Sequence, residues 1–132
     1  MKLIVNVDGG ARGNPGPAAI GIVIRDEEGN VLADVGETIG QATNNVAEYR
    51  ALIRGIELAR ELGGDDLKIH GDSELVVKQM LGQYKVKHPD MKPLHARAKE
   101  ALSDVTWSIS HVRREQNADA DALVNQALDA AA

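Results

Sequence analysis

The chain contains no cysteine and no phenylalanine, and its aromatic side chains are limited to one Trp and two Tyr among 132 residues. Without cysteine it has no disulfide, no thiol nucleophile and no thiolate ligand for a metal. The scarcity of aromatic residues means that a hydrophobic core must be built from Val, Ile, Leu and Ala. The first apolar run, from Leu3 to Val7, is interrupted by Asn6 and is too short for a secretory signal or a membrane span. We therefore expect a cytoplasmic protein without membrane contact.

The size and charge of the chain limit its possible partners. We expect a single domain over residues 1–132, because a chain of this length buries about two thirds of the surface that it exposes when unfolded. The net charge of −5 argues against a nucleic-acid partner. However, residues 78–99 carry six Lys or Arg and a single acid, Asp90. Such a segment is compatible with a polyanion held by cationic side chains and metal ions, although a solvated helix face and loop explain it more simply.

The spacing of apolar residues predicts the secondary structure, since strands alternate and helices repeat every three or four residues. Strands are expected at residues 2–8, 18–26, 31–39, 66–72 and 104–112, and helices at 46–62, 73–82, 94–102 and after an N-cap at Asn117. Strands that are separated by helices require parallel pairing with right-handed crossovers. The sequence therefore predicts an α/β fold with a five-stranded mixed sheet, in which three antiparallel strands precede the parallel ones, the first strand is central and helices flank the sheet.

Four acidic residues are expected near the carboxyl ends of the parallel strands, where sheets of this kind bind their ligands. Asp8 follows the first strand and Asp72 the fourth, whereas Glu48 and Asp121 lie near the starts of helices. Like charges in one cleft repel, so either some acids stay protonated or cations lie between them. Oxygen ligands without Cys or His favour Mg²⁺ or Mn²⁺. Two such ions suit in-line hydrolysis of a phosphodiester, one activating water and the other stabilising the leaving oxygen.

Simpler structural explanations exist for three of these positions, and the sequence leaves them open. Asp72 or Ser73 would serve as the N-cap of the helix that follows. Glu48 stands three residues after Asn45, which is the spacing of the acid in a capping box with Asn45 as the N-cap. Asp119 and Asp121 both complement the positive end of a helix dipole.

Four motifs, in order along nearly the whole chain, resemble type 1 ribonuclease H: VDGGARGNPGP, TNNVAEYRAL, HGDSELVVKQ and REQNADADALVNQAL. The resemblance implies the ribonuclease H-like fold and an endonuclease that cuts the RNA strand of RNA/DNA hybrids, leaving 5′-phosphate and 3′-hydroxyl ends. It implies two Mg²⁺ ions in each site, with Mn²⁺ as a substitute. No protein partner is implied, and we expect a monomer. The forms of the motifs are similar to the short archaeal and actinobacterial branch of the family.

The resemblance also assigns roles to individual residues. Four acids are implied to be catalytic and to bind the metal ions: Asp8, Glu48, Asp72 and Asp121. Asp119 lies outside this set, and His111 matches a mobile family histidine that is thought to help proton transfer or product release. By periodicity alone, His111 fits a surface histidine at the end of a strand equally well. Hybrid recognition requires small polar and backbone groups that sense 2′-hydroxyls across a shallow minor groove. The residues expected to contact the hybrid are Gly10, Arg12, Asn14, Thr43, Asn44, Asn45 and Ser73.

The chain departs from the family pattern at positions that face the substrate. Val46 stands where many relatives carry an arginine for a DNA phosphate, and Glu74 stands where relatives often carry glutamine. The loop from Lys85 lacks the tryptophan-rich basic protrusion of longer members. We therefore expect weaker and more salt-sensitive binding of the substrate.

Three other functions fit parts of the pattern less well. The glycine-rich stretch after the first strand suggests a nucleotide-binding loop, but it lacks a GK[ST] motif and is followed by a strand rather than a helix. A non-catalytic hybrid-binding scaffold of the same fold is disfavoured because all four acids are present. A metal nuclease acting on DNA is disfavoured because the asparagines and the TNN motif suit a substrate that contains RNA.

Overall fold

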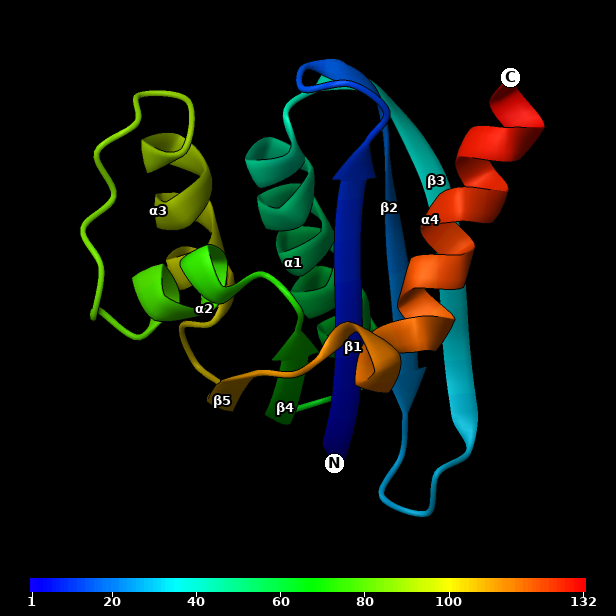
Figure 1. Cartoon of the computed structure of the whole chain (residues 1–132). Helices are drawn as coiled ribbons and strands as arrows, with labels where there is room; N and C mark the ends of the chain where they lie inside the picture. The colour runs from blue at the N-terminus through cyan, green and yellow to red at the C-terminus, as the bar shows by residue number, and fades with distance from the viewer.

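The computed structural model describes residues 1–132 and contains one five-stranded sheet with helices on both faces (Figure 1). The strands are β1 (Lys2–Ala11), β2 (Gly16–Arg25), β3 (Val31–Ala42), β4 (Asp66–Gly71) and β5 (Thr106–His111). The helices are α1 (Asn44–Glu61), α2 (Glu74–Met80), α3 (Lys92–Ala101) and α4 (Ala118–Ala131), with a 3₁₀ turn η1 (Arg114–Asn117) before α4. None of the helices combines the length and the apolarity that a bilayer crossing requires.

The strand order β3-β2-β1-β4-β5 confirms the predicted fold class and the central position of β1. On one side β1 pairs antiparallel with β2, which pairs antiparallel with β3. On the other side β1 pairs parallel with β4, and β4 pairs parallel with β5. The carboxyl-terminal half of β1 therefore borders the point where β4 ends.

Alternation along β1 determines which side chains face each layer of the molecule. Leu3, Val5 and Val7 face α1 and belong to a buried cluster that includes Leu52 of that helix. The opposite face carries α4, which lies across β2 and β3 (Figure 1). The core is aliphatic as predicted, and Tyr49 is its one fully buried aromatic side chain.

Two element boundaries differ from the prediction in ways that matter for the site. β1 continues to Ala11 instead of ending at Asp8, because residues 9–11 pair with β2. Asp8 therefore lies inside the strand, where it is 7% exposed. α1 begins at Asn44, earlier than predicted, because Thr43 caps its first turn.

Asn117 occupies the predicted N-cap position of α4, but it does not cap the helix with its side chain. Its Nδ2 instead donates to the carbonyl oxygen of Val7 at 2.9 Å, and its Oδ1 accepts from Nδ2 of Asn6 at 3.0 Å. Because Asn117 is only 1% exposed, its amide acts as an internal link between β1 and the start of α4.

The close packing of α4 on the sheet depends on Gly21 in β2. A Cβ at this position would lie 2.2 Å from the carbonyl oxygen of Ala120. Gly21 is also the partner of Asp8 across the β1–β2 ladder. This contact therefore sets the distance between α4 and the part of the sheet that carries Asp8.

We predict that Gly21→Ala lowers the free energy of unfolding by about 1–3 kcal/mol, the usual cost of overpacking, because the added methyl group displaces the backbone of α4. Urea denaturation measures the change. Gly10→Ala is the matched control, since a Cβ there would meet only Cγ1 of Val124 at the ordinary distance of 3.5 Å. Equal stability of the two variants would contradict this account of the packing.

Candidate active site

Asp8 and Asp72 lie where β1 and β4 separate. The last pair of the parallel ladder is Val7 with Gly71, so the two aspartates directly follow the final paired residues. The carbonyl of Val7 accepts the hydrogen bond from Asn117, and the carbonyl of Gly71 accepts a backbone hydrogen bond of 2.9 Å from the segment after β5. These bonds satisfy backbone groups at the end of the ladder, where the strands part and the aspartates face a common opening.

Glu48 reaches the same place from near the start of α1. Its carboxylate accepts a hydrogen bond from the N–H of Gly9. Gly9 allows α1 and β1 to approach closely, because a Cβ there would lie 2.2 Å from the carbonyl oxygen of Ala47. The capping-box interpretation of Glu48 is wrong, since the N-cap is Thr43 and not Asn45. The glutamate is therefore directed toward β1.

The alternative role of Asp72 as a helix cap is also wrong. Oγ of Ser73 accepts a hydrogen bond of 3.3 Å from the N–H of Val76 and is the N-cap of α2. The side chain of Asp72 is only 10% exposed. Its carboxylate is thus free of the helix end and faces the other two acids.

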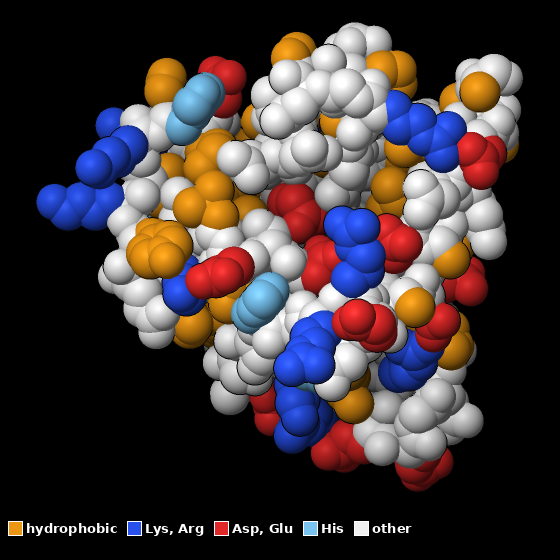
Figure 2. All heavy atoms as spheres, viewed as in Figure 1, with side chains coloured by type: hydrophobic (Ala, Val, Ile, Leu, Met, Phe, Trp, Pro, Cys, Tyr) orange, Lys and Arg blue, Asp and Glu red, His pale blue; other side chains and the backbone are white.

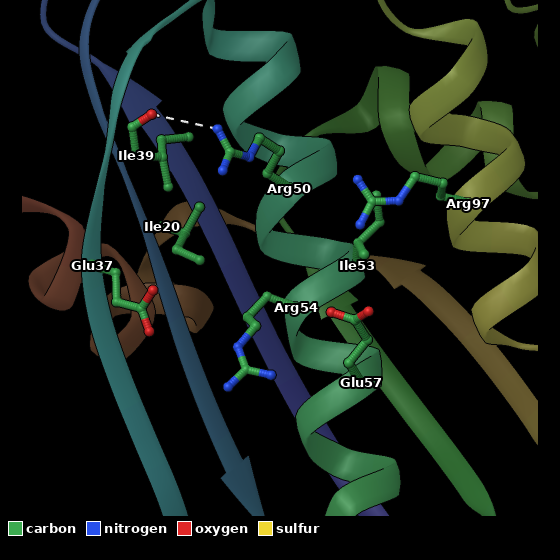
Figure 3. Close-up of a pocket in the computed structure, with 8 residues that line it drawn as sticks. All are labelled: Ile20, Glu37, Ile39, Arg50, Ile53, Arg54, Glu57 and Arg97. Atoms are coloured by element: carbon green, nitrogen blue, oxygen red, sulfur yellow. Dashed lines mark hydrogen bonds between the residues drawn. The ribbon is translucent and has the colours of Figure 1, made fainter.

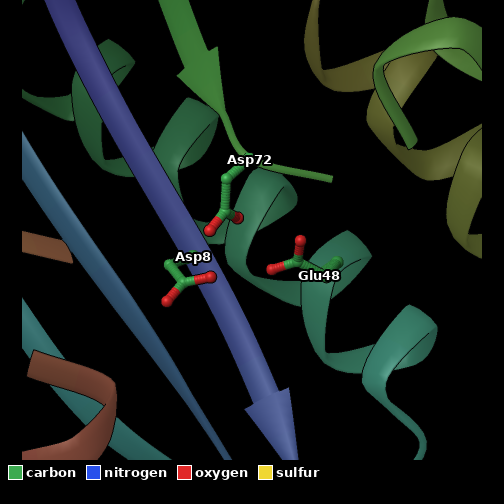
Figure 4. Close-up of side chains that lie close together, drawn as sticks. All are labelled: Asp8, Glu48 and Asp72. Atoms are coloured by element: carbon green, nitrogen blue, oxygen red, sulfur yellow. The ribbon is translucent and has the colours of Figure 1, made fainter. Parts of the chain in front are cut away.

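The carboxylates of Asp8, Glu48 and Asp72 converge (Figure 4). One oxygen of each lies within 4.8 Å of the others, an arrangement that could hold a metal ion. Burial, followed by the charges of Glu48 and Asp72, raises the pKa of Asp8 to about 9. Burial and the charge of Asp72 raise the pKa of Glu48 to about 7, although the N–H of Gly9 opposes this rise. Without a cation, the cluster therefore retains protons near neutral pH.

The two acids in the first turn of α4 have different surroundings. Asp119 forms an ion pair with Arg25 of β2, which gives it a structural role. Asp121 is half-buried, and its Oδ2 lies 3.4 Å from Nδ2 of Asn125. Asp121 does not belong to the group of three converging carboxylates. Its assignment to the metal site stays a prediction.

His111 and Arg114 flank Asp72 from the segment between β5 and α4. His111 is exposed, and its Nε2 lies 3.2 Å from the carbonyl oxygen of Asp72. Arg114 is not among the predicted site residues, yet its Nε lies 3.8 Å from Oδ2 of Asp72 and its charge opposes the rise in the pKa of Glu48. In the sequence, Arg114 is the first residue of the motif REQNADADALVNQAL, but it was assigned no role there.

Several predicted substrate contacts lie together where the β1–β2 turn meets the start of α1. Oδ1 of Asn14 accepts from the N–H of Asn44 at 3.1 Å, and Oδ1 of Asn44 accepts from the N–H of Ala11 at 2.8 Å. Both amide oxygens are occupied, and the amide nitrogens face no protein acceptor. Arg12 is paired with Asp129 of α4 at 2.6 Å. This surface therefore has free donors, although its contact with a nucleic acid stays a prediction.

The other predicted substrate contacts are distributed over the same region. Thr43 and Ser73 use their hydroxyl oxygens as helix caps. Asn45 is exposed in the first turn of α1, and Gly10 is half-buried in β1. Their roles toward a substrate also stay predictions.

A separate cavity of about 160 Å³ lies beside α1, between β3 and α3 (Figure 3). It is lined by Ile20, Glu37, Ile39, Arg50, Ile53, Arg54, Glu57 and Arg97. Arg50 donates to the carbonyl oxygen of Ile39 at 3.4 Å. Because none of the predicted site residues lines this cavity, it is not part of the candidate active site.

Comparison with known protein families and sequences gives consistent matches. The reverse transcriptase-like family matches residues 6–127. Ribonuclease HI of Halobacterium salinarum is 50% identical over 92% of this chain and 62% of its own length. Bifunctional protein Rv2228c of Mycobacterium tuberculosis is 48% identical over 100% of this chain and 37% of its own length. Ribonuclease H of Dechloromonas aromatica is 34% identical over 92% of this chain and 90% of its own length. The chain thus spans less than two thirds of the first two relatives and nearly all of the third.

Solved structures extend the match to the fold. The crystal structure of RNase H1 from the archaeon Halobacterium salinarum NRC-1 has a TM-score of 0.96 and 47% identity, covering 98% of this chain and 99% of that one. The crystal structure of LC11-RNase H1 in complex with an RNA/DNA hybrid has a TM-score of 0.92 and 47% identity, covering 98% of both chains. The similarity therefore includes nearly every element described above.

The acidic cluster predicts how stability depends on pH when no metal is bound. The pKa of Asp8 is about 9 in the folded protein, against 3.8 for an unperturbed aspartate. Between these values the native state binds more protons than the unfolded state, so stability falls as the pH rises. In EDTA, we predict that Asp8→Asn raises the free energy of unfolding by roughly 1–4 kcal/mol at pH 8 and changes it little at pH 4. Urea unfolding at both pH values tests this, and a variant no more stable than the wild type at pH 8 would exclude a buried repulsion.

Proposed function

The chain belongs to the ribonuclease H family, and we propose that it hydrolyses the RNA strand of RNA/DNA hybrids to give 5′-phosphate and 3′-hydroxyl ends. The observation that supports this most strongly is the convergence of Asp8, Glu48 and Asp72 at the carboxyl end of the β1–β4 ladder, where the two strands separate. The similarity to LC11-RNase H1, which binds an RNA/DNA hybrid in its crystal structure, supports the substrate class.

The donor set fits a divalent cation that prefers oxygen, and we propose Mg²⁺, with Mn²⁺ as a substitute. Three carboxylates offer oxygen ligands without nitrogen or sulfur, which is the composition that these ions favour. The raised pKa values of Asp8 and Glu48 fit the same conclusion, because a cation would stabilise charges that burial disfavours. Asp72 completes the set, and Asp121 is proposed as a fourth ligand. When bound, two such ions activate the attacking water and stabilise the leaving oxygen.

The contacts of the chain itself orient these carboxylates. The N–H of Gly9 holds Glu48 toward β1, and the ladder between β1 and β2 fixes the backbone of Asp8. The guanidinium of Arg114 places a positive charge beside Asp72, where the phosphate of the substrate would lie. These contacts limit the reorganisation that the site needs before it reacts.

His111 is proposed to move the proton that hydrolysis requires. The attacking water loses a proton, and the 3′-oxygen gains one when its bond to phosphorus breaks. An imidazole both accepts and donates protons near neutral pH. Because His111 is exposed and lies next to the backbone of Asp72, it can exchange protons with solvent at the edge of the site.

The free hydrogen-bond donors around the β1–β2 turn are proposed to recognise the RNA strand. The amide N–H₂ groups of Asn14, Asn44 and Asn45 and the backbone of Gly10 suit 2′-hydroxyl oxygens. The hydroxyl hydrogens of Thr43 and Ser73 remain available while their oxygens cap helices. Arg12 is proposed to leave its ion pair with Asp129 and bind a phosphate group of the substrate instead. A single-domain, monomeric and cytoplasmic enzyme stays a prediction.

A cleavage assay tests the proposed reaction. A labelled RNA/DNA hybrid, an RNA duplex and a DNA duplex are each incubated with Mg²⁺, Mn²⁺ or EDTA. We expect cleavage of the RNA strand of the hybrid with either ion, no cleavage in EDTA, and an intact DNA duplex. Asp8→Asn serves as the inactive control. Hybrid cleavage in EDTA, or cleavage of the DNA duplex alone, would refute the proposal.

The two acids of α4 provide a matched pair for the fourth ligand. We predict that Asp121→Asn lowers kcat on the hybrid by about 100-fold or more, which corresponds to about 3 kcal/mol of activation free energy. Asp119→Asn, which breaks only the exposed ion pair with Arg25, should keep kcat within a few-fold of the wild type. Steady-state kinetics distinguish the two variants, and the opposite order would assign the fourth ligand to Asp119.

A further inference from the structure

The loop between α2 and α3 carries two cationic side chains without protein partners. Lys85 and Lys87 are exposed, and neither takes part in any of the salt bridges of the chain. Nearby Lys78, in contrast, is paired with Glu74 at 2.6 Å. Figure 2 shows Lys and Arg side chains at the left margin of the same face that has acidic side chains at its centre. Unpaired cations in this position suit the phosphates of a polyanion.

The backbone of this part of the loop has very few hydrogen bonds. Residues 85–87 form no backbone–backbone hydrogen bond. Their one polar bond to the rest of the protein runs from Nε2 of Gln79 to the carbonyl oxygen of Lys85, at 3.3 Å. Val86 adds apolar contact with the core. The position of the two lysines therefore depends strongly on Gln79.

Gln79 is itself held by a buried contact with α1. Its Oε1 accepts a hydrogen bond of 2.5 Å from the hydroxyl of Tyr49. Gln79 is 3% exposed and Tyr49 is 0% exposed. His95 of α3 joins the same group, with its Nε2 at 3.3 Å from the carbonyl oxygen of Gln79 and its ring edge-on to Tyr49. One set of contacts thus connects the loop to the helix that carries Glu48.

A requirement for stability alone does not explain a buried amide at this position. Burying an amide and a hydroxyl is unfavourable unless they bond to each other, and an apolar pair of similar shape would be nearly as stable. An apolar side chain at position 79 would, however, lack the amide N–H that donates to the carbonyl oxygen of Lys85.

We propose that Gln79, held by Tyr49, is a positioning residue for substrate binding. It fixes the loop so that Lys85 and Lys87 contact the phosphate backbone of the nucleic acid outside the cleaved bond. Gln79 touches neither the substrate nor the acidic cluster, and it acts through the carbonyl of Lys85. This inference rests on the proposed hydrolysis of RNA/DNA hybrids.

The double variant Tyr49→Phe/Gln79→Leu tests the proposal. It removes both partners of the buried Tyr49–Gln79 hydrogen bond together, so neither residue is left with a polar group that has lost the other. Stability should stay close to that of the wild type. We expect KM for the hybrid to rise about three- to tenfold, with kcat within about twofold. The slope of log binding constant against log salt should become shallower by about one to two, as one or two phosphate contacts are lost. Backbone order parameters at residues 85–87 should fall from about 0.85 to below about 0.6.

Two further variants separate positioning from general destabilisation. Lys85→Gln/Lys87→Gln should reproduce the rise in KM, and adding it to the double variant should raise KM no further. Ile24→Val, a buried substitution in β2, should lower stability without changing KM. Wild-type KM and salt dependence in Tyr49→Phe/Gln79→Leu would overturn the proposal, as would a raised KM with unchanged order parameters. A wild-type protein that cuts no hybrid would instead refute the proposed function, whatever the order parameters show.

Discussion

The mutual repulsion of Asp8, Glu48 and Asp72 is the interaction on which the rest of the site depends. One carboxylate oxygen of each lies within 4.8 Å of the others, and burial raises the pKa of Asp8 and of Glu48. Three charges in such a place oppose folding unless protons or cations compensate them. If these strand ends were selected only for stability, they would carry apolar or neutral groups instead. The need for a cation therefore follows from the electrostatics of the fold as well as from family membership.

Backbone contacts and hydrogen bonds hold these charges in position. Gly9 and Gly21 bring α1 and α4 close to the sheet without intervening side chains. Thr43 and Ser73 cap α1 and α2, which leaves the neighbouring acids free of the helix ends. Asn117 bonds to β1 where the parallel ladder ends. The cluster is thus fixed by groups that resist displacement, and a site that binds metal ions for hydrolysis requires such preorganisation.

The element order and the central strand could be predicted because alternation and helical spacing are local properties of the sequence. The true end of β1 could not, since glycines at positions 9 and 10 have low strand propensity and are ordered by pairing with β2. The side-chain contacts of Asn117 were missed for a similar reason. Local preference favours an N-cap, but its partners Asn6 and Val7 lie 111 and 110 residues away in the chain.

Motif resemblance identified the acids, and the structure brings three of the four together. It assigned no role to Arg114, although that residue opens the last motif, because its contact with Asp72 depends on how η1 turns back toward β4. Gln79, which ends the third motif, was likewise given no role, because a polar residue in a short helix is normally expected on the solvent side. Long-range contacts of this kind depend on the tertiary fold, which the local pattern does not specify.

Proton release on metal binding tests the central claim most directly. Titration calorimetry of Mg²⁺ into the protein at pH 7, in buffers of different ionisation enthalpy, counts the protons released. Because the pKa of Asp8 is about 9 without a cation, metal binding should release about one proton or more from the wild type, and Asp8→Asn should lose most of this release. Binding without proton release, or equal release in both proteins, would contradict the account of a repulsive cluster that a cation stabilises.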